Sequence, residues 1–161
     1  MILKGGTMKK KVIKGLVVIL CMVIIFLFST DNSVESTKKS NRVIIEVTSF
    51  FKLDLSKKQQ QHVIDMFFVP VRKMAHFFIY FVLGIALVSF LREFSIPIRK
   101  LLLLSIFLAF LYACTDEFHQ LFVPGRSGQI IDVLLDTFGA SVGVFIYYLV
   151  FHKKLKEKCY E

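Results

Sequence analysis

Four long apolar runs alternate with polar segments along the chain. Residues 12–28 and 74–91 are each long enough to cross the hydrocarbon core, which requires about 17 to 25 helical residues. The third run stays apolar only over Leu101–Ala113, so its helix must continue through polar residues to Phe122 if it is to span. The fourth covers residues 130–151. This pattern predicts an all-α polytopic membrane protein with four transmembrane helices.

A short amphipathic helix is predicted between the first two spans, within residues 30–69. Ser56-Lys57-Lys58-Gln59 is a capping box, in which the serine side chain and the glutamine side chain each bond an orphan backbone amide. An apolar stripe follows, on the face opposite Lys57, Lys58 and Gln61, and consists of Val63, Ile64, Phe67 and Phe68. We expect Pro70 to turn the chain into the second span. The stripe could lie in the membrane interface or pack on the protein's own surface, and both placements stay open.

Composition supports the membrane assignment. The chain has 161 residues, 55% of them apolar, and eighteen phenylalanines, which one soluble domain of this size could not bury. Twenty-one Lys and Arg against twelve Asp and Glu give a net charge of +9. In so apolar a chain this charge favours an anionic membrane surface over nucleic acid. Cys21, Cys114 and Cys159 form no metal-binding or disulfide pattern and are interpreted as free thiols.

The basic residues predict the orientation. Lysines precede the first span, basic residues lie within 92–100, and more lysines follow the fourth span, so these segments are expected on the cytoplasmic side. Both termini are then cytoplasmic, and the first span is a retained signal anchor. The predicted organisation is a basic N-terminus and first span (1–29), an extracytoplasmic segment (30–69), a three-span core (70–152) and a basic tail (153–161).

Ionisable residues gather where the last three spans meet one membrane face. Because successive spans alternate in direction, the start of the second, the end of the third and the start of the fourth lie on the same side, which is the outer side in the predicted orientation. The candidate site residues are Arg72, Lys73, His76, Tyr80, Asp116, Glu117, His119, Gln120, Arg126, Asp132 and Asp136.

Helical spacing indicates that these groups face other helices. Residues four apart lie on one helix face, which aligns Asp132 with Asp136 and Arg72 with His76. The acidic stripe continues towards Gly139 and Gly143, a pair of small residues that permits close approach of another helix. We therefore expect the carboxylates to point into the bundle.

Three interpretations of this cluster remain open. Ion pairs could simply fix the helix ends, or arginines could bind the phosphate or carboxylate of an anionic headgroup. Alternatively, His76 or His119 could act as a general acid or base beside carboxylates that orient it or hold a divalent cation. The sequence contains no metal-protease motif such as H-E-x-x-H, and neither a metal site nor a cofactor is predicted.

Three motifs in this order resemble the VanZ-like membrane protein family. They are Arg72-Lys73-x-Ala75-His76-Phe77-x-x-Tyr80-x-x-Leu83-Gly84, Asp116-Glu117-x-x-Gln120-x-Phe122-x-Pro124-x-Arg126 and Asp132-x-x-x-Asp136-x-x-Gly139. The resemblance covers roughly residues 70–140, and the family more often has Asn where this chain has Asp136. It implies a multi-pass protein of the bacterial plasma membrane that is connected with the cell envelope and with teicoplanin resistance, and it implies no established substrate.

Together these observations predict a protein that binds an envelope component at its outer face. The expected partners are membrane lipids and a lipid-linked wall precursor or a glycopeptide, with no nucleic acid, while the oligomeric state is left open. In this hypothesis arginines hold the anion, acids and Gln120 orient it, and His76 is the proton-sensitive member. The alternative is a membrane-embedded enzyme that uses the His and carboxylate cluster on a lipid-linked substrate.

Overall fold

The computed structural model describes residues 4–30, 33–51, 56–94, 96–126 and 128–159, and over these residues it consists of helices joined by short connectors, with no strand. Five helices follow one another along the chain: α1 (Lys4–Thr30), α2 (Ser33–Phe50), α3 (Lys57–Leu91), α4 (Ile98–Gln120) and α5 (Ile130–Cys159). The all-α prediction is thus confirmed.

Four of the helices contain segments long and apolar enough to cross a membrane. These segments are Met8–Thr30, Val69–Leu91, Ile98–Gln120 and Ile130–Phe151. The third reaches the required length only because α4 continues through its polar C-terminal turn, as the sequence predicts. The protein is therefore a multi-pass membrane protein with four spans.

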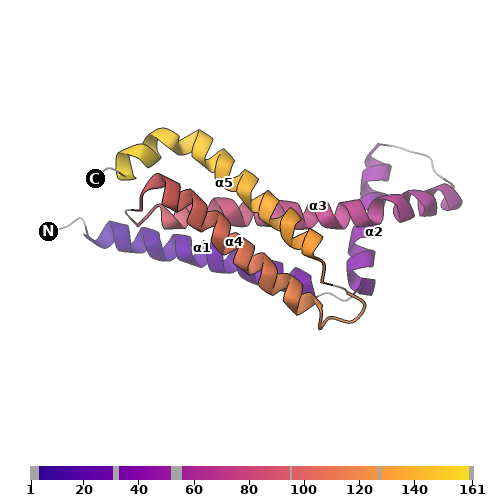
Figure 1. Ribbon diagram of the computed structural model, residues 1–161. Coiled ribbons are helices and arrows are strands. Elements are labelled where there is room, and N and C mark those ends of the chain that lie inside the picture. Colours follow the sequence, from indigo (N-terminus) through magenta and orange to yellow (C-terminus); the bar gives the residue numbers. More distant parts are fainter. Residues whose placement is uncertain (1–3, 31–32, 52–55, 95, 127, 160–161) are drawn as a thin grey trace.

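The four spans lie side by side in a bundle, with α3 at its centre (Figure 1). Helix α3 packs against each of the other helices, and its most extensive interface is with α5. The beginning of α1 and the end of α5 lie at the same end of the bundle. The opposite end, where α4 stops and α5 starts, is called the polar end below.

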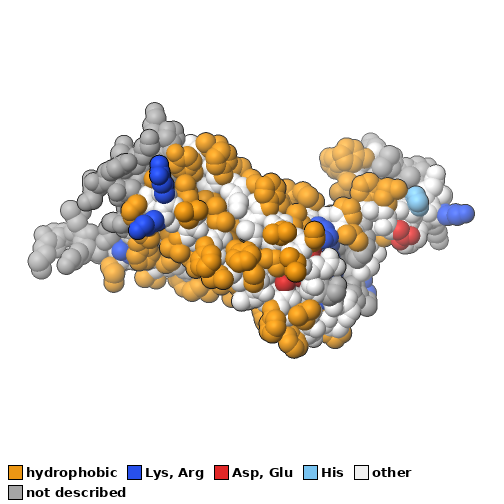
Figure 2. Space-filling view, in the orientation of Figure 1, with side chains coloured by type: hydrophobic (Ala, Val, Ile, Leu, Met, Phe, Trp, Pro, Cys, Tyr) orange, Lys and Arg blue, Asp and Glu red, His pale blue; other side chains and the backbone are white. Residues whose placement is uncertain are grey.

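The outer surface of the bundle is apolar. Figure 2 shows hydrophobic side chains covering its visible side, with charged residues near the two ends. Leu103, Phe107 and Phe145 each leave more than half of their surface exposed, at 68%, 54% and 57%. A water-soluble fold rarely exposes so continuous an apolar surface, whereas acyl chains would cover it without cost.

Helix α3 begins with the predicted capping box and then differs from expectation at Pro70. Ser56 accepts a hydrogen bond from the Gln59 amide, and the Gln59 side chain accepts one from the Ser56 amide at 3.0 Å. The expected turn at Pro70 is wrong, because the helix continues through this proline. The amphipathic segment and the second span therefore form one helix, whose first twelve residues extend roughly 18 Å beyond the span.

Helix α2 packs across this extension of α3 (Figure 1). We call α2 together with residues 57–68 the arm. Ile44 of α2 and Ile64 of α3 are both buried, while Phe67 remains 48% exposed. Part of the apolar stripe thus packs on the protein itself, as one of the two placements left open by the sequence requires. The side chain of Phe68 lies outside the described residues.

Glycines bring α3 and α5 into backbone contact. A Cβ atom added at Gly143 would lie 2.2 Å from the Phe81 carbonyl oxygen, and one at Gly139 would lie 2.5 Å from that of Phe77. The predicted close approach is confirmed, and it places the start of α5 directly beside the turns of α3 that carry His76.

Candidate functional site

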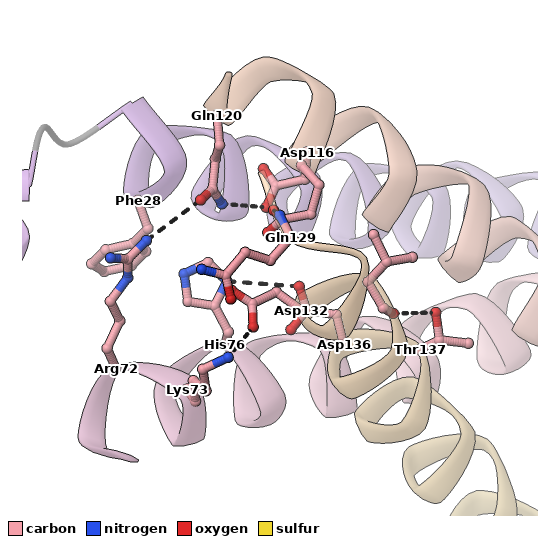
Figure 3. A network of polar contacts seen from close by, with 12 residues as sticks. Phe28, Arg72, Lys73, His76, Asp116, Gln120, Gln129, Asp132, Asp136 and Thr137 are labelled. Carbon is pink, nitrogen blue, oxygen red and sulfur yellow. Dashed lines mark hydrogen bonds and ion pairs between the residues drawn. The ribbon is translucent and has the colours of Figure 1, made fainter. Parts of the chain in front are cut away.

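Polar side chains from α3, α4 and α5 converge at the polar end (Figure 3). Because α3 enters the span where α4 leaves it and α5 returns, helix direction brings the three polar turns to one depth. In membrane-spanning helices such groups are expected to face one another, since lipid offers them no partner.

A chain of polar contacts links α3 to α4. An Arg72 guanidinium nitrogen donates to Gln120 Oε1 at 3.4 Å, and Gln120 Nε2 donates to Asp116 Oδ2 at 3.4 Å. A second link joins α3 to α5, where the Lys73 ammonium group forms an ion pair with Asp132. The Lys73 and Asp132 side chains keep 33% and 22% of their surfaces exposed, so this pair lies at the edge of the cluster.

The connector between α4 and α5 is held against the end of α4. The buried Glu117 side chain accepts a hydrogen bond from the Gln129 backbone amide at 2.8 Å, immediately before α5 begins. Gly125 has φ 76°, a left-handed conformation that suits glycine in a turn. A Cβ at Gly128 would lie 2.7 Å from the Glu117 carbonyl oxygen, so the connector passes close to α4.

His76, Asp116 and Asp136, one from each of α3, α4 and α5, form a compact group. His76 Nδ1 lies 3.7 Å from Asp136 Oδ2, and the two aspartates are 3% and 0% exposed. Tyr80, one helical turn further along α3, is completely buried.

Two cavities adjoin these residues. The larger, which we call the cationic cavity, has a volume of about 180 Å³ and is lined by Val69, Arg72, Lys73, Gly125, Arg126, Gln129 and Asp132. The smaller, which we call the histidine cavity, has a volume of about 10 Å³ and is lined by Arg72, Lys73, His76, Glu117, Gln120, Asp132, Leu135 and Asp136. Lys73 and Asp132 line both cavities, so their ion pair lies between them.

The structure brings most of the predicted residues together and separates two of them. Nine line one of the two cavities or join the buried acidic group: Arg72, Lys73, His76, Asp116, Glu117, Gln120, Arg126, Asp132 and Asp136. Tyr80 lies beneath them in the core. His119 lines neither cavity and instead packs on Phe26 of α1, with ring centroids 4.7 Å apart.

Sequence reasoning missed the contribution of α1. Arg126 donates to the Phe28 carbonyl oxygen at 3.3 Å, and the neighbouring Ser29 is fully buried. The polar pair Ser29-Thr30, which follows the apolar run 12–28, could have indicated that the end of α1 takes part in the site. Gln129 was also missed, because it contacts Glu117 through its backbone amide, which every residue except proline has.

This arrangement combines two chemical capacities. The cationic cavity presents two guanidinium groups and an ammonium group, which suit a phosphate or carboxylate. The histidine cavity presents an imidazole beside carboxylates, which suits proton transfer or coordination of a cation. Its polar groups approach from three helices, so they are held by the packing of the bundle.

Comparison with known proteins identifies the family. A family model described as VanZ/LLP1 matches residues 15–151, which extends the resemblance seen in the sequence beyond residues 70–140 to α1 and α2. No curated protein and no solved structure matches the chain. Because the family match covers most of the chain and reaches into all four spans, this protein belongs to the VanZ-like family of membrane proteins.

Proposed function

We propose that this protein binds the anionic headgroup of a cell-envelope lipid or a lipid-linked wall precursor in the cationic cavity. The observation that carries the proposal is the lining of that cavity, about 180 Å³ in volume, by Arg72, Lys73 and Arg126, whose three positive charges exceed the one negative charge of Asp132. A phosphate group accepts paired hydrogen bonds from guanidinium groups, and arginine presents these donors in a fixed planar geometry.

The position of the cavity at a bundle end supports a lipid as the ligand. The acyl chains of such a ligand can lie along the exposed apolar side chains, while its headgroup stays at the depth of the charged residues. A soluble anion would gain only the polar contacts. A lipid would gain both, and it is concentrated in the membrane beside the site.

We place the polar end on the outer side of the plasma membrane, with both termini in the cytoplasm. Basic residues at the opposite end, including Arg92, Arg99 and Lys100, support this orientation through the preference of such loops for the cytoplasm. In this orientation the site meets wall precursors at the leaflet where glycopeptides also act, so loss of the protein is expected to alter teicoplanin susceptibility.

Lipid binding can be measured on the purified protein by native mass spectrometry. The probes are dioleoyl phosphatidylglycerol, undecaprenyl phosphate and the zwitterionic dioleoyl phosphatidylcholine. We expect retention of one or both anionic lipids and at least tenfold weaker retention by Arg126→Gln, because a charge-assisted hydrogen bond contributes about 1.5 to 3 kcal/mol. Arg99→Gln, an exposed arginine of α4 at the opposite end, is the matched control.

Equal retention of the three lipids, or equal binding by both arginine variants, would contradict the proposal. The two anionic probes also separate its two sources of phosphate, a bulk phospholipid and a wall-precursor carrier. In the native bacterium, a deletion strain complemented with each variant links binding to teicoplanin susceptibility. We expect Arg99→Gln, but not Arg126→Gln, to restore the wild-type response.

The orientation is tested by cysteine labelling in a variant without the native cysteines. Pro124→Cys lies in the exposed connector at the polar end, and Lys100→Cys lies in the first turn of α4 at the other end. A membrane-impermeant maleimide should label Pro124→Cys in intact cells and Lys100→Cys only after permeabilisation. The reverse pattern would invert the topology.

A second candidate function is enzymatic. It is favoured by the 3.7 Å contact between His76 and Asp136 at the wall of the histidine cavity, next to the cationic cavity where a headgroup would bind. In this hypothesis the imidazole exchanges a proton with a bound lipid-linked substrate. The enzyme predicts a change in lipid mass after incubation with purified protein, which His76→Gln abolishes, whereas unchanged spectra favour binding alone.

A further inference from the structure

The buried group formed by His76, Asp116 and Asp136 is suited to a function that headgroup binding does not require. Each residue comes from a different span, and each offers one ligand atom such that the three atoms lie within 4.8 Å of one another. We propose that these three residues form a binding site for a divalent metal ion, which would join α3, α4 and α5 at the polar end.

The hydrogen bonding of the two aspartates supports this site. Asp136 is 0% exposed, and neither of its carboxylate oxygens has a hydrogen-bond partner among the described residues. Asp116 is 3% exposed, and its Oδ1 atom likewise lacks such a partner. Buried carboxylate oxygens without partners are unfavourable, and a coordinated cation satisfies them.

Two of the neighbouring cations, Lys73 and Arg72, bond to groups outside the proposed site. Lys73 is paired with Asp132, and Arg72 donates to Gln120 rather than to a carboxylate. The remaining acid of the cluster, Glu117, accepts the hydrogen bond of the connector. Lys73 and Arg72 therefore bond to groups other than Asp116 and Asp136, whereas His76 lies 3.7 Å from Asp136.

The charge and donor types match a borderline transition metal. Two carboxylates and a neutral imidazole carry a charge of about −2, so a dication gives a neutral unit in a medium of low dielectric constant. Imidazole together with carboxylate oxygens is a common ligand set for Zn²⁺ and is also compatible with Mn²⁺. Mg²⁺ and Ca²⁺ favour oxygen ligands alone and are expected to bind more weakly.

Geometry permits coordination after a small movement of side chains. Ligand atoms around a metal at ~2.1 Å lie roughly 3.0 to 3.4 Å apart, so the present group, whose atoms lie within 4.8 Å of one another, must contract by up to about 1.5 Å. Three protein ligands leave at least one coordination position open. The histidine cavity, with a volume of about 10 Å³, has room for about one water molecule there.

Metal binding is tested with the metal ions alone, on full-length protein in uncharged detergent, carrying a streptavidin-binding tag in place of polyhistidine and stripped with EDTA. We expect one equivalent of Zn²⁺ by isothermal titration calorimetry and one equivalent of Mn²⁺ by electron paramagnetic resonance. Asp136→Asn, which removes the charge at nearly constant shape, should weaken both by at least tenfold. Asp65→Asn, an exposed aspartate on the arm, is the matched control and should bind as wild type.

A spectroscopic measurement on wild-type protein keeps the test valid if Asp136→Asn fails to fold. Electron spin echo modulation of bound Mn²⁺ should show coupling to one imidazole nitrogen. This coupling should persist in His62→Ala, on the exposed face of the arm, and in His119→Ala, and should disappear in His76→Ala.

Two outcomes would overturn the metal site. The first is absence of stoichiometric binding to folded wild-type protein, together with a melting temperature that Zn²⁺ leaves unchanged, which would indicate that the aspartates are neutralised by a shared proton. The second is an imidazole coupling that survives in His76→Ala. Lipid retention is measured separately, so failure of the metal site and failure of headgroup binding are distinguishable.

Discussion

The contact between α3 and α5 is tight enough that a single methyl group should separate the helices. In Gly84→Ala the new Cβ would lie 2.2 Å from the Ala140 carbonyl oxygen and 2.9 Å from its carbonyl carbon. All of these atoms belong to backbone, so no side chain can rotate away to relieve the clash. Ordinary carbon–oxygen contacts are about 3.3 Å, so the two helices must move apart by roughly 1 Å.

The expected energetic cost follows from this displacement. Overpacking a well-packed interface typically costs about 1 to 3 kcal/mol, and a rigid backbone clash belongs near the upper value. Replacing glycine by alanine inside a helix returns up to about 1 kcal/mol. We therefore expect Gly84→Ala to lower the free energy of unfolding by about 2 kcal/mol, a factor of roughly 30 in the unfolding equilibrium.

Gly15→Ala is the matched control, because it makes the same chemical change on α1. Its Cβ would lie 3.3 Å from Phe90 Cε2, an atom at the end of a movable ring. This variant should be neutral or slightly stabilised. The chain contains no tryptophan, so unfolding in mixed micelles is best followed by circular dichroism as the denaturing detergent increases. Equal stability of Gly84→Ala and wild type would refute the proposed backbone contact.

Three further predictions concern the polar contacts. Lys73→Met should lower the free energy of unfolding by about 1 kcal/mol in the same assay, because it leaves Asp132 without its cation; the cost stays small because part of the pair is exposed. The double variant Lys73→Met with Asp132→Leu should lose less, because it leaves no unpaired charge. Glu117→Ala should destabilise by about 1 to 2 kcal/mol and Glu117→Gln by less, since glutamine retains an acceptor for the Gln129 amide. Tyr112→Phe should cost about 1 kcal/mol, because its hydroxyl donates at 2.6 Å to a backbone carbonyl of α1.

The spans were predictable from the sequence because hydrophobic length is a direct requirement of the bilayer. Even the short apolar run of α4 could be extended through the polar residues that follow it, since the membrane sets a minimum number of helical residues. The extension was predicted to reach Phe122, and the helix ends two residues earlier, at Gln120. The continuation of α3 through Pro70 was not predictable in the same way. Proline removes one backbone donor and usually bends or ends a helix. Here α3 nevertheless continues through Pro70, and α2 packs against α3.

The candidate site was predictable as a set of residues but not as a set of contacts. Alternating helix direction and a spacing of four residues were sufficient to place Asp132 and Asp136 with His76. The choice of Asp132 as partner of Lys73, however, depends on the rotation and depth of α5 relative to α3. These follow from the glycine contacts at 84, 139 and 143, whose partner helix the sequence did not identify.

His119 is a residue that the sequence groups with the candidate site but that the structure places outside it. By sequence it belongs to the polar turn of α4, together with Asp116 and Gln120, but residues three positions apart on a helix differ by about 60° in direction. Here that angle turns His119 towards Phe26 of α1, away from both cavities. Of the two candidate proton-transfer residues, helix rotation alone selects His76, and it does so by placing that side chain against Asp136.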